Sequence, residues 1–189
     1  MHYKKNIVTF LVFLFFSSII YFLIIKQIIY PTIIPMIKNG VINIFVDWRV
    51  ILHANICHEK GFDTYINNPC SPWNGKHVYG QILLYIPFIT NFPNFYFIYL
   101  PIILNLIFLY TVINFFKYEN TIGYICLFLI VFSAPIILAI ERANIDIAIF
   151  LLLILISKNK NILINYLILI LTTISKFYPI CMAIIFLLK

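Results

Sequence analysis

The sequence predicts an all-α fold, a polytopic transmembrane helical bundle of about six membrane helices with a large first extracytoplasmic loop. Hydrophobic residues make up 63% of the 189 positions, charged residues make up 10%, and the mean hydropathy is +1.03. Long apolar runs alternate with short polar turns, and one substantial hydrophilic segment interrupts them. A soluble core cannot absorb so many apolar side chains without leaving large apolar patches in water. We therefore expect a single multi-pass integral membrane domain over residues 1–189, in the cell (inner) membrane.

The net charge of the chain points to lipid rather than to nucleic acid. A formal charge of +7 comes from 13 Lys and Arg against 6 Asp and Glu, and the basic residues are scattered singly or in pairs. In a membrane protein such an excess reports topology and anionic lipid head groups. A nucleic-acid site needs a basic face with interleaved aromatic residues. The membrane is an expected partner, and nucleic acid is not.

The first predicted membrane helix covers residues 7–25. This largely apolar run, from Ile7 to Ile25, is long enough at about 1.5 Å per residue to cross a hydrocarbon core of about 30 Å. It is too long for a typical signal-peptide core, and no small-residue cleavage site follows it. We therefore predict a retained helix with Lys4 and Lys5 in the cytoplasm.

The hydrophilic segment, residues 26–81, is the predicted extracytoplasmic loop and contains an amphipathic helix at the membrane interface. The apolar residues that recur there at helical spacing are Val41, Ile44, Phe45, Trp48, Ile51 and Leu52. Residues 61–75 are so rich in Gly, Pro and Asn that they predict an irregular, turn-rich loop. The aromatic and amide side chains of this loop suit a sugar or a lipid head group, and they are equally common at any membrane interface.

Residues 95–188 are predicted to form the helical bundle. Phe95 to Phe116 and Thr121 to Ile140 are each long enough to span a membrane, the second with Pro135 near its end. Ile147 to Ile156, Ile162 to Ile174 and Phe177 to Leu188 are shorter, so each is either extended by its polar neighbours or does not cross alone.

Alternation of these helices places three polar regions on one side of the membrane, provided that Ile82 to Thr90 does not cross. The regions are residues 26–81, 141–146 and 175–179. Counting Lys and Arg does not settle which side this is. The shared side is the inference that matters for function.

The four cysteines fall into two kinds of environment. Cys126 and Cys181 lie within apolar runs and are interpreted as small buried hydrophobic residues. Cys57 and Cys70 lie in the polar loop and are expected to form a disulfide only if that loop faces an oxidising compartment. Neither pair has the spacing or the His partners of a zinc site, so no metal is predicted.

The most informative stretch is Glu141-Arg142-Ala143-Asn144-Ile145-Asp146, a polar cluster set between two apolar runs. Charged groups near membrane depth are costly unless they face protein, water or one another, which makes them functional candidates. The alternatives are a simple surface loop or, if residues 143–146 are helical, a salt bridge between Arg142 and Asp146. The acids and bases expected on the shared side are Asp47, Glu59, Asp63, Glu141, Asp146, Arg49, Arg142 and Lys176.

These residues resemble a known family. The cluster at 141–146, an apolar run, a short basic turn, a second apolar run and then Lys176-Phe177-Tyr178-Pro179 are similar to glycosyltransferase family 87, whose members usually have Gly at the position of Ala143. Gly61-Phe62-Asp63-x-Tyr65, Asn68-Pro69-Cys70 and Pro72-Trp73 look like the first extracytoplasmic loop of that family. Its members are polytopic transferases of the GT-C fold that use polyprenyl-phosphate sugars and have many more helices, so we expect an N-terminal portion or a truncated copy.

The resemblance implies roles for individual residues. Asp47 matches the catalytic acid of the first outer loop and would act as general base, with Asp63 as the second choice. Arg142 and Lys176 would hold the donor phosphate, Asn144 and Asp63 would orient sugar hydroxyls, and Glu141 and Asp146 would complete the substrate site.

The predicted function is therefore transfer of a hexose, such as mannose, from a polyprenyl-phosphate donor to an extracytoplasmic lipid or glycan acceptor, without a cofactor. One alternative is a membrane transporter or flippase, whose short helices would surround a midplane site. The other is an inactive remnant or subunit of a transferase.

Overall fold

A computed structural model describes residues 2–25, 37–38, 41–42, 44–73, 75–115 and 121–181. Within these ranges the chain is helical, as predicted, and one antiparallel pair of two-residue strands joins β1 (Ile37–Lys38) to β2 (Val41–Ile42). The α-helices of the described residues are α1 (His2–Ile25), α2 (Val46–Glu59), α3 (Leu100–Phe115), α4 (Thr121–Val131), α5 (Ala134–Arg142), α6 (Ile145–Lys158) and α7 (Ile162–Ser175). Shorter helical turns are η1 (Gln81–Leu84), η2 (Phe95–Tyr99) and η3 (Tyr178–Cys181).

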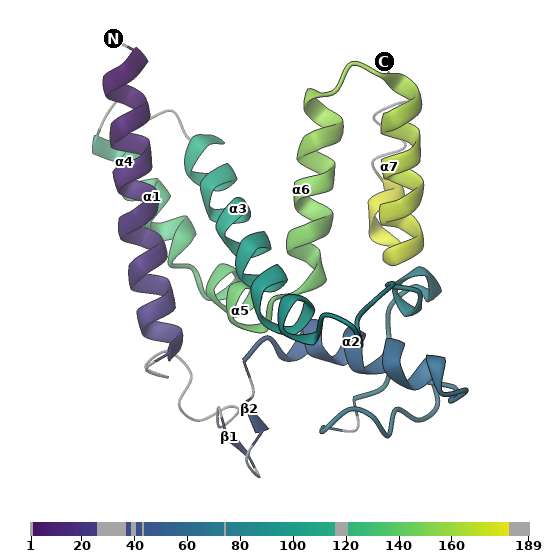
Figure 1. The fold of residues 1–189 in the computed structure, drawn as a ribbon. Helices are drawn as coiled ribbons and strands as arrows, with labels where there is room; N and C mark the ends of the chain where they lie inside the picture. Colours follow the sequence, from purple (N-terminus) through teal and green to yellow (C-terminus); the bar gives the residue numbers. More distant parts are fainter. Residues whose placement is uncertain are drawn as a thin grey trace.

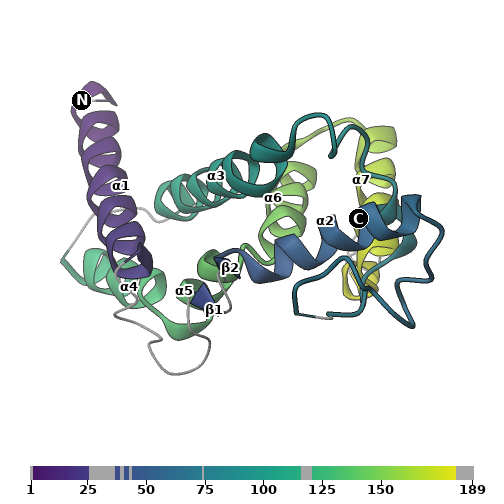
Figure 2. The same ribbon diagram turned by 60° about the horizontal axis from the view of Figure 1, so that its bottom comes forward.

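The helices form a row with one helix lying across its end. α1 packs on α3, α3 on α6 and α6 on α7. α2 crosses below α3, α6 and α7 in Figure 1, and Figure 2 shows it passing across the same end of the row. The turn between α6 and α7 lies at the opposite end. The polar segments therefore meet at the end of the row that α2 covers.

An apolar core and one buried amide hold α3 in place. Phe16 and Ile20 of α1 pack with Leu109 and Ile113 of α3, all of them buried. Asn105, 1% exposed, donates its side-chain amide to the Ile140 carbonyl oxygen of α5 at 2.9 Å. A buried polar group is costly unless it is hydrogen-bonded, so this contact fixes α3 against the end of α5.

The region from Thr121 to Ile140, which the sequence predicts as a single span, is not one continuous helix. The chain breaks into α4 and α5, whose axes differ by 46°, and Ser133 at the break is extended. Pro135 lies in the first turn of α5, where its missing N–H costs nothing, whereas within a continuous helix it would remove a backbone hydrogen bond and its ring would clash with the carbonyl group four residues earlier. The proline therefore begins a new helix instead of kinking a long one.

The predicted amphipathic helix is present as α2, but it begins at Val46 and not near Val41. Phe45, which precedes it, adopts a left-handed conformation (φ 60°), so the right-handed helix begins only at the next residue. The Trp48 indole donates to the Tyr96 carbonyl oxygen at 2.8 Å, in the wide turns of η2 that lead into α3. This bond fixes α2 against the entrance of α3.

The loop that follows α2 is irregular, as its Gly, Pro and Asn content predicts. Cys57 and Cys70 form a disulfide with Cα atoms 5.6 Å apart, and the Asn68 side chain donates to the Gly75 carbonyl oxygen at 2.9 Å. Residues 82–90 contain only the end of η1 followed by turns, so this segment does not cross as a helix. The interpretation of Cys126 and Cys181 as buried is wrong, because both are exposed in helices whose outer faces are apolar.

Among the described residues, one helix, Phe95–Asn114, is long and apolar enough to cross a membrane, and the bent pair of α4 and α5 would be a second. α7 and the Leu11–Phe22 part of α1 are shorter apolar helices. Of the last predicted run, only 177–181 lies within the described residues, and it forms η3. Large apolar side chains are exposed on several helices, among them Phe15, Ile107, Phe128, Leu167 and Ile170.

Gly80 joins the loop to the end of α7. Its N–H donates to the Ser175 carbonyl oxygen at 3.0 Å, and a Cβ atom at this position would overlap the Ile174 carbonyl oxygen. We expect Gly80→Ala to lower the free energy of unfolding by about 2 kcal/mol, because backbone cannot move aside as a flexible side chain does. Thermal unfolding in detergent measures the loss. Val78→Ala, at an exposed position of the same loop, is the control, and equal stability of the two variants would contradict this account.

Candidate functional site

The corner between α5 and α6 carries the predicted polar cluster. α5 ends at Arg142, Ala143 is left-handed (φ 45°, ψ 55°), and Asn144 caps α6 by accepting a hydrogen bond from the Asp146 N–H at 3.0 Å. The N–H of Asn144 donates back to the Ala139 carbonyl oxygen at 2.9 Å, which closes the end of α5. The corner is sharp, so Arg142 and Asp146 do not share a helix face and the alternative of a salt bridge between them is wrong.

Arg142 instead binds Asp47, the predicted general base. Its Nη2 donates to Oδ1 at 2.6 Å, and its Nε lies 3.0 Å from both carboxylate oxygens. The Asn144 side-chain amide donates to Oδ2 of Asp47 at 3.3 Å. The Asp47 side chain is 15% exposed and that of Arg142 is 30% exposed, so the pair is largely shielded but reachable. A guanidinium fork matches a carboxylate or a phosphate equally well.

A backbone contact supports this pairing. The N–H of Phe45 donates to the Glu141 carbonyl oxygen at 3.0 Å, directly beside the ion pair. α2 is thus joined to the end of α5 by both backbone and side chain, although the partners are 95 positions apart.

A second ion pair joins α6 to the segment after α7. Lys176 Nζ lies 2.6 Å from Oδ1 of Asp146, and the Tyr178 hydroxyl donates to the same oxygen at 3.0 Å. Lys176 Nζ also lies 5.3 Å from the ring centroid of Tyr79 and 5.9 Å from that of Tyr178, within the range of cation–π attraction. The ammonium is therefore placed by one carboxylate and two aromatic rings.

Tyr79 connects the two ion pairs electrostatically. Burial, and then the negative charges of Asp47 and Asp146, raise the pKa of its phenol to about 12. The pKa of Tyr178 is also raised, mainly by burial and then by Asp146. Both hydroxyls therefore stay protonated at neutral pH, and that of Tyr178 is the one that donates to Asp146.

The remaining predicted residues fall outside this cluster or contribute differently. Glu141 takes part through its backbone carbonyl. Asp63 lies in the loop, where its Oδ1 accepts from the Tyr65 N–H at 3.1 Å, and it lines a separate pocket. Arg49 stacks over the Phe97 ring at 5.9 Å, and Glu59 is exposed at the end of α2.

Sequence reasoning missed the two tyrosines. Tyr178 stood within the Lys176-Phe177-Tyr178-Pro179 motif, so a signal for it was present. Tyr79 lies in a stretch without periodicity or motif, and the contact of the next residue, Gly80, with the end of α7 brings it beside Lys176. No local pattern could have identified it.

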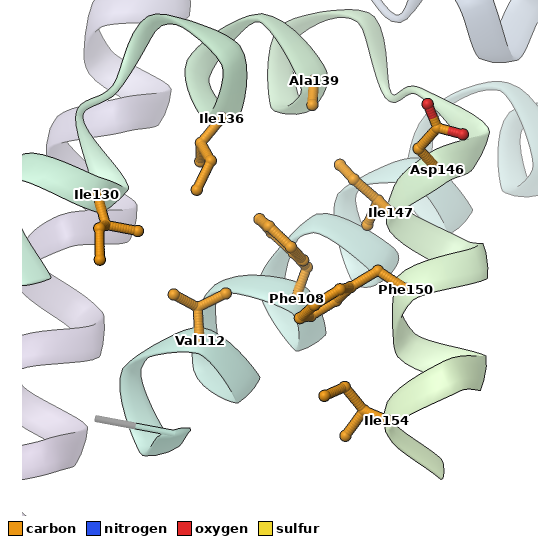
Figure 3. A pocket seen from close by; sticks show the side chains of 9 residues that line it. All are labelled: Phe108, Val112, Ile130, Ile136, Ala139, Asp146, Ile147, Phe150 and Ile154. Atoms are coloured by element: carbon orange, nitrogen blue, oxygen red, sulfur yellow. The ribbon is translucent and has the colours of Figure 1, made fainter. Parts of the chain in front are cut away.

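An apolar pocket of about 430 Å³ is lined at one end by Asp146 of the second ion pair. Phe108 and Val112 of α3 form one wall, and the bent α4–α5 pair and α6 form the others. Figure 3 shows Asp146 at one end of this pocket, apart from the apolar side chains. The arrangement suits a molecule with a long apolar tail and a polar head.

Comparison of the chain with protein-family models, with characterised proteins and with solved structures finds no match. The described residues contain no group of three or more His, Cys, Asp or Glu suited to hold a metal ion. The functional argument therefore depends on the geometry of the two ion pairs and of the apolar pocket.

Substitutions of Ala143 test whether the corner between α5 and α6 carries backbone strain. A left-handed conformation costs an L-residue about 1 to 2 kcal/mol, and a β-branched residue pays more. We expect Ala143→Gly to leave stability nearly unchanged, because relief of this strain offsets the extra freedom of Gly in the unfolded chain. Ala143→Val should lose about 2 kcal/mol or more.

Unfolding in detergent, followed by tryptophan fluorescence, measures both changes. Ala134→Val, an exposed position in the first turn of α5, is the control for introducing Val. A large loss of stability in Ala143→Gly would mean that the Ala143 methyl packs more strongly than the corner is strained.

Proposed function

We propose that this protein is a multi-pass membrane glycosyltransferase that transfers a hexose, such as mannose, from a polyprenyl-phosphate donor to a lipid or glycan acceptor on the extracytoplasmic side. The observation that carries the proposal is the pair of ion pairs beside the α5–α6 corner, Asp47 with Arg142 and Asp146 with Lys176, of which Asp146 also lines the apolar pocket. A lipid phosphate has the matching parts: an apolar chain, an anionic head and a sugar.

The setting of the site supports a membrane location. α3 with η2 is long and apolar enough to span, the bent α4–α5 pair is a candidate second span, and apolar side chains cover exposed helix faces. Such faces are stable against lipid and costly in water. α2, which lies across the end of the row, is placed as an interfacial helix would be (Figure 1). The two ion pairs would then lie near the membrane surface.

The Cys57–Cys70 disulfide supports the extracytoplasmic orientation. Disulfides persist in oxidising compartments and are rare in the cytosol. The bridge joins α2 to the turn-rich loop, on the same end of the molecule as Asp47. A donor that presents its sugar outside the cytoplasm would meet the site there.

In the resting site each cation is already occupied by a carboxylate. Asp47 holds Arg142, and Asp146 holds Lys176. A donor phosphate would compete for both cations, and because phosphate binds the guanidinium fork as a carboxylate does, Arg142 could pass from Asp47 to the phosphate. Asp47, released from its partner, would be free to accept a proton. Donor binding would thereby prepare the base.

The chemical step follows from these roles. The acceptor hydroxyl oxygen attacks the anomeric carbon of the sugar from the side opposite the phosphate, and the bond from that carbon to the phosphate oxygen breaks. Asp47 takes the hydroxyl proton, while Arg142 and Lys176 stabilise the charge on the leaving polyprenyl phosphate. The transfer inverts the anomeric centre and needs no nucleotide or cofactor.

The first test replaces the proposed base. In proteoliposomes with a radiolabelled polyprenyl-phosphate hexose, Asp47→Asn should lower transfer at least about 100-fold, because an amide cannot take the proton. Glu59→Gln removes a carboxylate from the exposed end of the same helix and should transfer as the wild type does. Asp47→Asn protein that is folded and fully active would overturn the assignment of the base.

The bend between α4 and α5 gives a reason to test transport as well, since broken helices surround the sites of many transporters. A transporter moves labelled substrate across the vesicle membrane without chemical change. Flux of intact donor without any sugar transfer by the wild type would replace the proposed function with this one.

The membrane arrangement makes its own prediction. Lys76 lies in the loop at the α2 end, and Lys160 lies in the turn between α6 and α7 at the opposite end (Figure 1). With Cys126 and Cys181 replaced by Ser, Lys76→Cys and Lys160→Cys should react with a membrane-impermeant thiol reagent from opposite sides. Labelling of both from one side would contradict a spanning α6.

A further inference from the structure

A second pocket lies in the extracytoplasmic loop, apart from the apolar one. Its volume is about 410 Å³, and its wall combines the carboxylate of Asp63 and the amide of Gln81 with the rings of His58, Phe62 and Tyr65. Phe62 is 46% exposed and Tyr65 is 43% exposed, so both rings are open to a ligand. None of these side chains takes part in the two ion pairs.

The composition of this loop pocket fits a sugar ring. A pyranose has hydroxyls that both donate and accept hydrogen bonds, and flat patches of C–H groups that pack on aromatic faces. Ionised Asp63 accepts from two adjacent hydroxyls, and Gln81 both donates and accepts. Exposed rings such as Phe62 and Tyr65 supply an apolar surface with little loss of conformational freedom. A phosphate would be repelled by Asp63, since the pocket offers no Lys or Arg among the residues that line it.

The structure holds the wall of the loop pocket in place before any ligand binds. Asp63 Oδ1 accepts from the Tyr65 N–H at 3.1 Å, which fixes the turn that carries both residues. The N–H of His77 donates to the Thr64 carbonyl oxygen at 2.9 Å, and the His77 ring packs edge-on against the Tyr65 ring at 5.1 Å. A pre-organised wall saves the ordering cost that a flexible loop would pay on binding.

One residue links the loop pocket to the ion pairs. The Tyr65 hydroxyl donates to the Tyr79 carbonyl oxygen at 3.0 Å, and the Tyr79 ring contacts Lys176. A sugar in the loop pocket would therefore contact Tyr65, which is hydrogen-bonded to Tyr79, and Tyr79 in turn contacts Lys176, one of the cations proposed to hold the donor phosphate. That is where the remainder of a glycan acceptor would lie while its reactive hydroxyl faces Asp47.

We propose that the loop pocket binds a hexopyranose unit of a glycan acceptor through Asp63, Gln81 and the rings of Phe62 and Tyr65. The assignment of this sugar to an acceptor rests on the proposed function, whereas the binding of a sugar does not. Asp63 is then a residue that selects the acceptor and not a second catalytic base.

Binding is tested on the full chain in detergent by saturation-transfer difference NMR with methyl α-mannopyranoside and methyl α-glucopyranoside. Wild-type protein should bind at least one of these glycosides. Asp63→Asn should weaken that binding about tenfold, because it removes the charge that strengthens the hydrogen bonds. The Asn side chain keeps an oxygen for the Tyr65 N–H, so the turn is preserved, and Gln81→Ala provides a second, independent variant.

Two controls separate this proposal from the proposed function. Lys76→Gln changes a charge elsewhere in the loop and should bind as the wild type does. Asp47→Asn, which should lose transfer, should keep glycoside binding. Binding retained by a protein that shows no transfer at all would overturn the proposed function and leave the sugar pocket standing.

Three results would overturn the sugar pocket itself. The first is the absence of glycoside binding by the wild type. The second is equal affinity of the wild type and of Asp63→Asn and Gln81→Ala. The third is loss of binding in Asp47→Asn with retention in Asp63→Asn, which would place the glycoside at the ion pairs.

Discussion

The ion pair between Arg142 and Asp47 is the contact on which the arrangement of the site depends. It joins α2 to the end of α5, far along the chain, and the Asn144 side chain, which also caps α6, donates to the same carboxylate. If Arg142 lost its partner, a largely shielded cation would remain beside apolar helices, although Ile51 and Leu52 of α2 would still share a buried apolar cluster with Ile145 and Ile149 of α6. One interaction thus positions the proposed base and orients the helix that carries it.

The local balance of charge explains why such a site is stable without a substrate. Charges at the edge of an apolar bundle are tolerated when they face one another, and here two cations face two carboxylates with tyrosines between and beside them. The same balance makes the site sensitive to the binding of an anion. An incoming anion adds negative charge to a neutral set, so a carboxylate releases its cation to the anion, and the released carboxylate is then free to take the proton of the acceptor hydroxyl, as a general base requires.

The sequence predicts the helical class, a helix within the polar segment, the irregular loop and the membership of Asp47, Arg142, Asp146 and Lys176 in one region. These follow from periodicity, from turn residues and from the cost of charge near apolar runs, all of which act over short distances. The pairing of the charges could not be predicted, because it depends on the left-handed corner at Ala143, where a non-glycine residue is unexpected. The location of Asp63 in a separate pocket and the position of Tyr79 depend on how the loop folds back onto α7, which no local pattern encodes.

The close approach of Gly80 to the end of α7 also has a thermodynamic meaning. Because the backbone of the loop is in contact with the residue before Lys176, a displacement of the loop cannot occur without a displacement of the second ion pair. Two ligands that bind on either side of such a contact change each other's affinity, and they do so by the same factor in both directions. The loop and the cation after α7 therefore form one cooperative unit, in which a ligand bound to the loop changes the affinity of the second ion pair for an anion.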